Sequence, residues 1–226
     1  MNIVPLRPKA KRRFDQFGVT EETLNARANF LASRGFLTDT KILFLGDYDL
    51  TSLAVIPIMK NAEVWTLDID DDVLAVIKKK SRGAVVGVKH NLTSPLPKKM
   101  LAAFDMVFTD PPYTPEGVSL FLSRSLEALS KGERARVVLS YGTSEKAPER
   151  ALAVQEKILK HGLLIEELLP GFNEYLAAKT IGDRSDLYVL RPTPKTRPLI
   201  RGEYQGKIYT YERSARLSGG QAGLLR

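Results

Sequence analysis

The sequence contains no cysteine and only two histidines, His90 and His161, which lie far apart in the chain. The lack of cysteine excludes disulfides, a thiolate nucleophile and cysteine-bound metal, and two distant histidines argue against a histidine metal site. The sequence also lacks any apolar run near the roughly 20 residues that a membrane-spanning helix needs, and its first residues lack the apolar stretch of a signal peptide. We therefore expect a cytoplasmic protein without metal or membrane contact.

Positive charge is concentrated near the two ends of the sequence. Residues 1–13 carry five Lys or Arg and no acid, and residues 191–226 carry a net +6. These two segments leave −3 of the total +8 for residues 14–190, so the central part is mildly acidic. Basic terminal segments are candidates for contact with nucleic acid, but they do not make the central part a nucleic-acid-binding domain.

Strand and helix patterns alternate along the central part of the chain. Runs of apolar residues predict strands at 41–46, 63–67, 84–88, 105–109, 136–140, 163–169 and 187–190. Helical periodicity, caps and terminal charges predict helices at 20–35, 50–60, 71–80, 118–129 and 148–160. This alternation predicts an α/β protein with a doubly wound, mostly parallel sheet, whose last two strands form an antiparallel pair.

The same pattern divides the chain into three parts. We expect residues 1–13 to be a flexible basic segment and residues 14–191 to be a Rossmann-like catalytic domain. Residues 192–226 begin with a proline-containing linker and form a basic tail, within which residues 203–211 are a candidate for a small hairpin.

The strand at 105–109 ends in Asp110, Pro111, Pro112 and Tyr113. The two prolines cannot continue the strand ladder, so the backbone leaves the sheet at its carboxyl end, where open α/β sheets bind ligands. A carboxylate, a proline carbonyl and a phenol ring suit the binding of an uncharged amine. The motif resembles the D-P-P-Y motif of class I S-adenosylmethionine-dependent transferases that alkylate amino nitrogens, and this resemblance implies their fold.

Other strand ends carry the polar residues that an adenosyl donor needs. Gly46 and Asp47 follow the first strand, Asp68 and Asp70 follow the second, and Asn91 follows the third. The first loop lacks the glycines that bind a pyrophosphate. We therefore predict that these five residues bind an adenosyl sulfonium, with an acid on the ribose and Asn91 at the adenine edge.

The first loop also distinguishes between two donors. Asp47 and Asp49 would favour the ammonium end of decarboxylated S-adenosylmethionine over the carboxylate of S-adenosylmethionine. With that donor, the expected reaction is transfer of its aminopropyl group to an amine.

Several motifs together resemble the catalytic domain of the branched-chain polyamine synthases, the N4-bis(aminopropyl)spermidine synthase family. The resemblance covers roughly residues 12–192, and its motifs are Phe14-Asp15-Gln16, Val19-Thr20, Glu22-Thr23, Gly46-Asp47-Tyr48-Asp49-Leu50-Thr51-Ser52, Leu67-Asp68-Ile69-Asp70, Leu96-Pro97, Asp110-Pro111-Pro112 and Phe172-Asn173-Glu174-Tyr175. The implied co-substrate is decarboxylated S-adenosylmethionine, and the implied acceptor is spermidine or a related polyamine.

The resemblance also implies roles for single residues. Asp47 and Asp49 would bind the amine or accept its proton, and Asp110 would hold the nucleophile. The chain departs from the family at Tyr48, where a further aspartate is expected, and at Tyr113, where archaeal and thermophile members carry an acid. Those members also have an N-terminal winged-helix-like domain that we do not find in this sequence.

Other interpretations stay open. A methyltransferase that uses intact S-adenosylmethionine on an amino group of RNA or DNA fits the D-P-P-Y ending and the basic ends, with Tyr113 stacked on an extruded base. A non-catalytic binding module requires the carboxylates to be only caps. Glu174 and Tyr175 would close over the acceptor or merely cap a loop. We interpret Trp65 as a core residue and His161 as a solvated helix end. A homodimer is a further candidate.

Overall fold

The computed structural model describes residues 2–34, 39–142, 148–176 and 184–210. Gly35, the predicted end of the first helix, lies outside these ranges. None of the helices in the described ranges is both long and apolar enough to cross a membrane.

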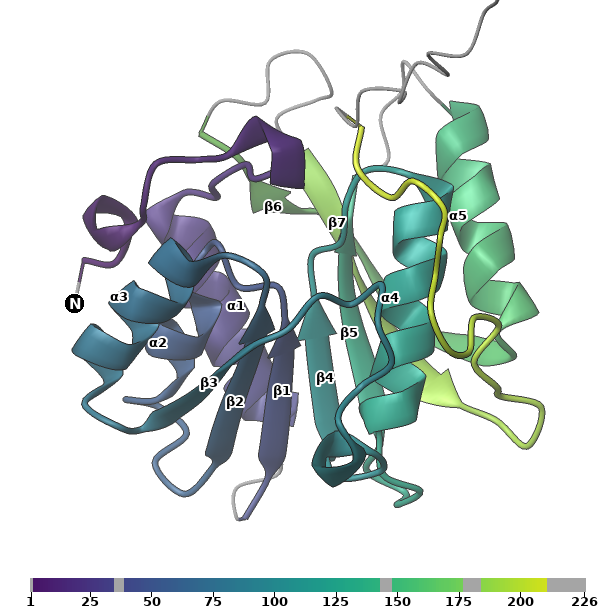
Figure 1. The fold of residues 1–226 in the computed structure, drawn as a ribbon, viewed down its shortest axis with the longest axis horizontal. Helices are drawn as coiled ribbons and strands as arrows, with labels where there is room; N and C mark the ends of the chain where they lie inside the picture. The colour runs from purple at the N-terminus through teal and green to yellow at the C-terminus, as the bar shows by residue number, and fades with distance from the viewer. Residues whose placement is uncertain (1, 35–38, 143–147, 177–183, 211–226) are drawn as a thin grey trace, which may run out of the picture.

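Seven strands form one twisted sheet in the order β3-β2-β1-β4-β5-β7-β6 (Figure 1). The strands are β1 (Lys41–Leu45), β2 (Glu63–Asp68), β3 (Val85–Lys89), β4 (Met106–Thr109), β5 (Arg136–Tyr141), β6 (Leu163–Glu174) and β7 (Arg184–Pro192). The first five are parallel, whereas β7 pairs antiparallel with both β5 and β6. This arrangement confirms the predicted doubly wound sheet with an antiparallel last pair.

Helices cover both faces of the sheet (Figure 1). They are α1 (Glu21–Arg34), α2 (Thr51–Val55), α3 (Asp71–Ser81), α4 (Pro115–Ala128) and α5 (Pro148–Lys160). Side chains of β1 alternate between two cores: Ile42 and Phe44 pack with α1, α2 and α3, whereas Leu43 and Leu45 pack with α4 and α5. Because both faces are buried, the parallel strands read as continuous apolar runs in the sequence.

Some predicted elements differ from the structure in extent. The helix predicted at 50–60 ends at Val55, because Pro57 has no N–H and disfavours a helical residue before it. The helix predicted at 118–129 begins earlier, at Pro115, where the Thr114 hydroxyl accepts a hydrogen bond from the Gly117 amide at 2.9 Å. Residues 172–174, predicted as a loop, belong to β6, which reaches Glu174 across two irregularities of register.

The N-terminal segment packs against the domain instead of standing apart from it. Ile3 is buried, and its amide donates to the Glu21 carboxylate at 2.9 Å. Arg7 contacts Asp49, and Lys11 forms ion pairs with Asp70 and Asp72 at the start of α3. These contacts differ from the expectation of a flexible segment. They also occupy two of its five basic side chains, while contact of the others with nucleic acid stays a prediction.

The described part of the C-terminal segment, residues 193–210, also packs against the domain. It runs along α4, where the buried Arg124 donates to the carbonyl of Gly202 at 2.6 Å (Figure 1). Its last described residue, Thr210, donates its amide to Asp15 at 2.8 Å, so this segment meets the early part of the chain over the carboxyl edge of the sheet. Residues 203–210 form no strand, and the predicted hairpin is wrong for that described stretch.

His161 is buried and not solvated, which corrects the sequence-based interpretation. Its Nδ1 lies 2.7 Å from the carbonyl of Lys157, and its Nε2 lies 3.0 Å from the hydroxyl of Ser123. That hydroxyl oxygen also accepts from the amides of Leu199 and Ile200. The segment that follows β7 therefore packs beside His161. The helix pattern around His161 gives no indication of this contact.

We expect His161 to make folding sensitive to acid. Burial lowers the pKa of its imidazole, so the folded state binds fewer protons than the unfolded state does. The contribution to stability is complete above the unfolded pKa of about 6.5 and is lost as the pH falls below it, by up to about 1.4 kcal/mol per pH unit. Urea unfolding at pH 7.5, 6.5 and 5.5 should show this loss in the wild type relative to His161→Gln.

The control for this comparison is His90→Gln, which removes the other histidine. It should keep the pH dependence of the wild type. Parallel profiles for the wild type and His161→Gln would contradict the prediction.

Candidate active site

A cavity opens at the carboxyl edge of the sheet, under the two terminal segments. Its lining combines carboxylates, aromatic rings and one arginine. The residues are Phe14, Asp15, Gln16, Phe17, Arg27, Gly46, Asp47, Tyr48, Asp49, Thr51, Leu67, Asp68, Ile69, His90, Leu92, Phe108, Asp110, Pro111, Tyr113, Phe121 and Tyr209. The sequence analysis placed Gly46, Asp47, Asp49, Asp68, Asp110, Pro111 and Tyr113 at this edge, and the structure brings these seven together.

The turn after β1 aims Asp47 at the start of α2. Gly46 has a φ of +72°, a conformation that suits glycine. The Asp47 carboxylate accepts hydrogen bonds from the amides of Thr51 at 2.7 Å and Ser52 at 3.2 Å. Burial nevertheless raises the pKa of Asp47 to about 8, although the hydrogen bond from Ser52 opposes this. A cation in the cavity would favour the ionised form of this carboxyl.

The two acids after β2 have different surroundings. Asp68 lines the cavity, accepts from the amides of Asp47 and Asp70 at 2.8 Å, and has a pKa that burial raises to about 6. Asp70 instead caps α3 through the amide of Asp72 and binds Lys11 and Gln16. Asp68 therefore lines the cavity, whereas Asp70 binds side chains of the N-terminal part of the chain.

Asn91 does not line the cavity. Its side chain is exposed, and its Oδ1 accepts from the amide of Thr93 at 3.0 Å, which closes a local turn. Its neighbours His90 and Leu92 line the cavity instead. An asparagine that follows a strand has two common uses, a ligand contact and a turn, and the sequence does not distinguish them.

Asp110 and Tyr113 lie where the D-P-P-Y pattern predicts them. The Asp110 Oδ2 accepts from Arg27 and from the Tyr175 hydroxyl, both at 2.8 Å. Burial raises the pKa of Asp110, while Arg27 opposes the shift. Tyr113 is buried, with its ring 5.6 Å from that of Phe17. Pro112 is absent from the lining.

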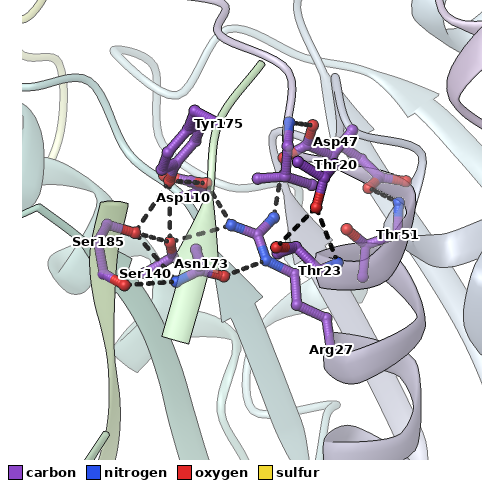
Figure 2. A network of polar contacts seen from close by, with 12 residues as sticks. Thr20, Thr23, Arg27, Asp47, Thr51, Asp110, Ser140, Asn173, Tyr175 and Ser185 are labelled. Atoms are coloured by element: carbon purple, nitrogen blue, oxygen red, sulfur yellow. Dashed lines mark hydrogen bonds and ion pairs between the residues drawn. The ribbon is translucent and has the colours of Figure 1, made fainter. Parts of the chain in front are cut away.

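Arg27 is the main site residue that the sequence analysis missed (Figure 2). Its side chain is 0% exposed and lies between two carboxylates, with 2.8 Å to Asp49 and 2.8 Å to Asp110. It also donates to Asn173 at 2.6 Å and to Ser140 at 3.1 Å. Burial lowers the pKa of the guanidinium, but the two carboxylates outweigh burial and raise it. Arg27 therefore stays charged inside the protein.

A signal for Arg27 was present in the sequence. Leu24, Ala28 and Leu31 define the buried face of the first helix, and Arg27 lies on that same face. A charge at such a position needs a buried partner of opposite charge.

Asp49 is paired more fully than the sequence analysis expected. Its Oδ1 accepts from the Val19 amide at 2.9 Å and lies 3.1 Å from Arg7, and its Oδ2 binds Arg27. Two arginines therefore balance Asp49 and Asp110, whereas Asp47 forms no ion pair with the residues that the structure describes. This favours Asp47 over Asp49 as the group that meets a cationic ligand.

Glu174 and Tyr175, which were expected to close over the acceptor or to cap a loop, have different surroundings. Glu174 is exposed, and its carboxylate lies 3.9 Å from Arg184. Tyr175 is buried, and its hydroxyl contacts Asp110, Ser140 and Ser185 (Figure 2). Tyr175 thus supports Asp110 through its hydroxyl, and Glu174 lies outside the cavity lining.

In the described ranges, no group of three or more His, Cys, Asp or Glu side chains is arranged to hold a metal ion.

The model of the branched-chain polyamine synthase A C-terminal domain matches residues 1–211 of this chain. The chain belongs to the branched-chain polyamine synthase family. This confirms the resemblance inferred from the sequence motifs. The part that the D-P-P-Y motif plays within the family stays a prediction.

Three known proteins that are similar to this chain illustrate the match. An uncharacterised protein of Methanocaldococcus jannaschii is 38% identical over 207 residues, which are 90% of this chain and 51% of that protein. The N(4)-bis(aminopropyl)spermidine synthase of the same organism is 32% identical over 179 residues, 77% of this chain and 51% of the enzyme. The chain therefore spans about half the length of the curated relatives it matches.

The third is a solved structure, the branched-chain polyamine synthase of Thermus thermophilus in complex with N4-aminopropylspermidine and 5′-methylthioadenosine. Its TM-score is 0.77 at 27% identity, and the match covers 91% of this chain and 65% of that one.

We expect the Arg27 network to be essential for stability. Arg27→Met removes the cation and leaves Asp49 and Asp110 close together in a buried place, which should cost about 3–5 kcal/mol in the free energy of unfolding. Arg34→Met, on the exposed end of the same helix, should cost less than about 1 kcal/mol. Urea unfolding at pH 7.5 measures both.

Arg27→Lys is a second variant for the case in which Arg27→Met does not fold. It keeps the charge but loses the planar fork that reaches both carboxylates. Its stability should lie between those of the wild type and Arg27→Met. Equal stability of the Arg27 and Arg34 variants would contradict the prediction.

Proposed function

We propose that this chain transfers an alkyl group from an adenosyl sulfonium to an amine nitrogen. The specific reaction is aminopropyl transfer from decarboxylated S-adenosylmethionine to spermidine or a related polyamine. The supporting observation is the related structure, which holds N4-aminopropylspermidine and 5′-methylthioadenosine together. The second molecule is what remains of that donor after its aminopropyl group has left.

The charge of the cavity supports a cationic substrate. Five aspartates line it, Asp15, Asp47, Asp49, Asp68 and Asp110, whereas Arg27 is the single Lys or Arg in the lining that the structure describes. Polyamines and the decarboxylated donor are both cationic at neutral pH. The carboxylate of S-adenosylmethionine would oppose the ionisation of Asp47 and so weaken its contact with the donor.

We assign the donor to the turn after β1 and the end of β2. Gly46 allows close approach of the donor, Asp68 binds the ribose hydroxyls, and Asp47 binds the ammonium of the aminopropyl group. The end of β3 lies beside the adenine through His90 and Leu92. Asp70 contributes by fixing the N-terminal segment above the donor.

We assign the acceptor to Asp110, Pro111 and Tyr113. The Asp110 contacts described above all fall on Oδ2, so Oδ1 is the oxygen offered to an N–H of the amine. The uncharged nitrogen attacks the methylene carbon beside sulfur and forms the C–N bond. The C–S bond breaks, its electron pair stays on sulfur as a neutral thioether, and the alkylated nitrogen gives its extra proton to the Asp110 carboxylate and from there to solvent.

The choice of donor provides the test of this proposal. We expect the decarboxylated donor to raise the unfolding temperature of the wild type more than S-adenosylmethionine does at equal concentration. A ligand at 100 times its dissociation constant stabilises a protein by about 2.7 kcal/mol. Incubation with spermidine should then yield an aminopropylated product and 5′-methylthioadenosine, which mass spectrometry identifies.

Asp47→Asn serves as the specificity control, because it removes the negative charge but keeps a side chain able to accept from the helix amides. It should reduce the preference for the decarboxylated donor. Preference of the wild type for S-adenosylmethionine, with methylated product, would contradict the proposal. That result would favour the methyltransferase alternative, with RNA or DNA amino groups as acceptors.

Asp110→Asn should lower turnover by at least about 100-fold, because an amide cannot accept the proton of the alkylated amine. Donor affinity should stay unchanged, since the donor contacts lie on other strands. Asp105→Asn, at the opposite end of β4, is the matched control and should keep full turnover. Unchanged turnover in Asp110→Asn would exclude the role assigned to Asp110.

A further inference from the structure

Asp15 reaches the cavity from outside the sheet. It follows the short 3-10 turn Arg12–Phe14 and has a φ of +50°, in the left-handed region. Its Oδ2 accepts from the amide and the hydroxyl of Thr210, at 2.8 and 3.0 Å. Contacts from both terminal segments therefore fix the position of this carboxylate above the cavity.

The other oxygen of Asp15 has no partner. The residue is only 7% exposed, it lines the cavity, and its Oδ1 is buried without a hydrogen-bond partner among the described residues. A buried carboxylate oxygen without a donor is costly, and such atoms are rare in folded proteins unless a ligand satisfies them. Burial also raises the pKa of Asp15, which a nearby cation would counteract.

Aromatic rings surround this part of the cavity. The ring of Phe14 lies 5.7 Å from that of Tyr209, and the ring of Phe17 lies 5.6 Å from that of Tyr113. All four line the cavity. A carboxylate between aromatic faces suits an alkylammonium, which makes a charge-assisted hydrogen bond to oxygen while its methylenes and its charge contact the rings. The same surroundings would reject an anion.

Asp15 lies on the acceptor side of the cavity. Asp15 and Tyr113 line the same cavity, and Phe17, two residues after Asp15, packs on the Tyr113 ring. Tyr113 closes the Asp110–Tyr113 turn, to which the acceptor nitrogen is assigned above. The groups assigned to the donor follow β1 and β2 instead.

We propose that Asp15 binds a terminal ammonium of the acceptor through Oδ1, while the attacking nitrogen of the same molecule lies at Asp110. This rests on the proposed function and deepens it. Asp15 is then a specificity residue, which selects acceptors that carry a second cationic nitrogen and disfavours monoamines. The two oxygens have separate partners, since Oδ2 binds Thr210 and Oδ1 would bind the substrate.

Binding of acceptors in the presence of 5′-methylthioadenosine tests this without turnover. Isothermal titration would compare spermidine with N-propyl-1,4-diaminobutane and N-butyl-1,3-diaminopropane. Each analogue lacks one of the two terminal amino groups of spermidine. Asp15→Asn should bind spermidine about 10- to 100-fold more weakly than the wild type, as expected for the loss of one charge-assisted contact. The wild type should bind one of the two analogues more weakly than it binds spermidine, by the same factor. Asp15→Asn should bind that analogue as well as it binds spermidine.

Two controls make the outcome specific. Asn tolerates a positive φ, so Asp15→Asn should keep the wild-type unfolding temperature within a few degrees. Asp71→Asn removes an exposed acid of equal charge at the start of α3 and should bind spermidine as the wild type does.

Each alternative outcome has a distinct meaning. If the wild type binds spermidine and Asp15→Asn binds it equally well, the assignment of Asp15 is wrong, although the proposed function stands. If Asp15→Asn weakens spermidine and both analogues by the same factor, the contact to a terminal ammonium is also wrong. If the wild type binds none of the three amines, the proposed function itself fails, and the role of Asp15 fails with it.

Discussion

The buried guanidinium of Arg27 is the interaction on which the site depends. It lies between Asp49 on the loop after β1 and Asp110 at the end of β4, and it binds Asn173 of β6 as well. One side chain from a helix thus connects three parts of the sheet's carboxyl edge. Without this cation, two carboxylates would lie close together in a buried place, where their repulsion and their desolvation both oppose ionisation.

This arrangement divides the acids of the cavity into two classes. Asp49 and Asp110 already have cationic partners within the protein, which offset part of their negative charge. Among the described residues, Asp47 has amide donors but no cationic partner. Burial raises its pKa to about 8, so a positive charge nearby would favour its ionised form. The number of aspartates in a loop is therefore a poor measure of its affinity for cations, because some of them are balanced from within.

Local sequence patterns predicted the features that depend on residues close together in the sequence. The apolar runs gave the strands, because the parallel strands are buried on both faces, and the residues that follow β1, β2 and β4 identified the edge where the cavity lies. The misses involve partners distant in the sequence. Nothing near Asp49 indicates that Arg27 will pair with it. Nothing near His161 indicates that residues 199–200 will bind the Ser123 hydroxyl that contacts its ring. The placement of Asn91 and Asp70 differs from the sequence-based expectation for another reason, because a turn or a helix cap uses the same residue types as a ligand contact does.

The contact between Asp15 and Thr210 joins residues that are 195 positions apart. The last strand ends at Pro192, so the residues of every described strand are synthesised before Thr210 and the sheet can form before Thr210 reaches Asp15. The order of synthesis therefore separates two events. The fold can form first, and a binding site able to hold a polycation follows only when the late segment has returned along α4 to the early one.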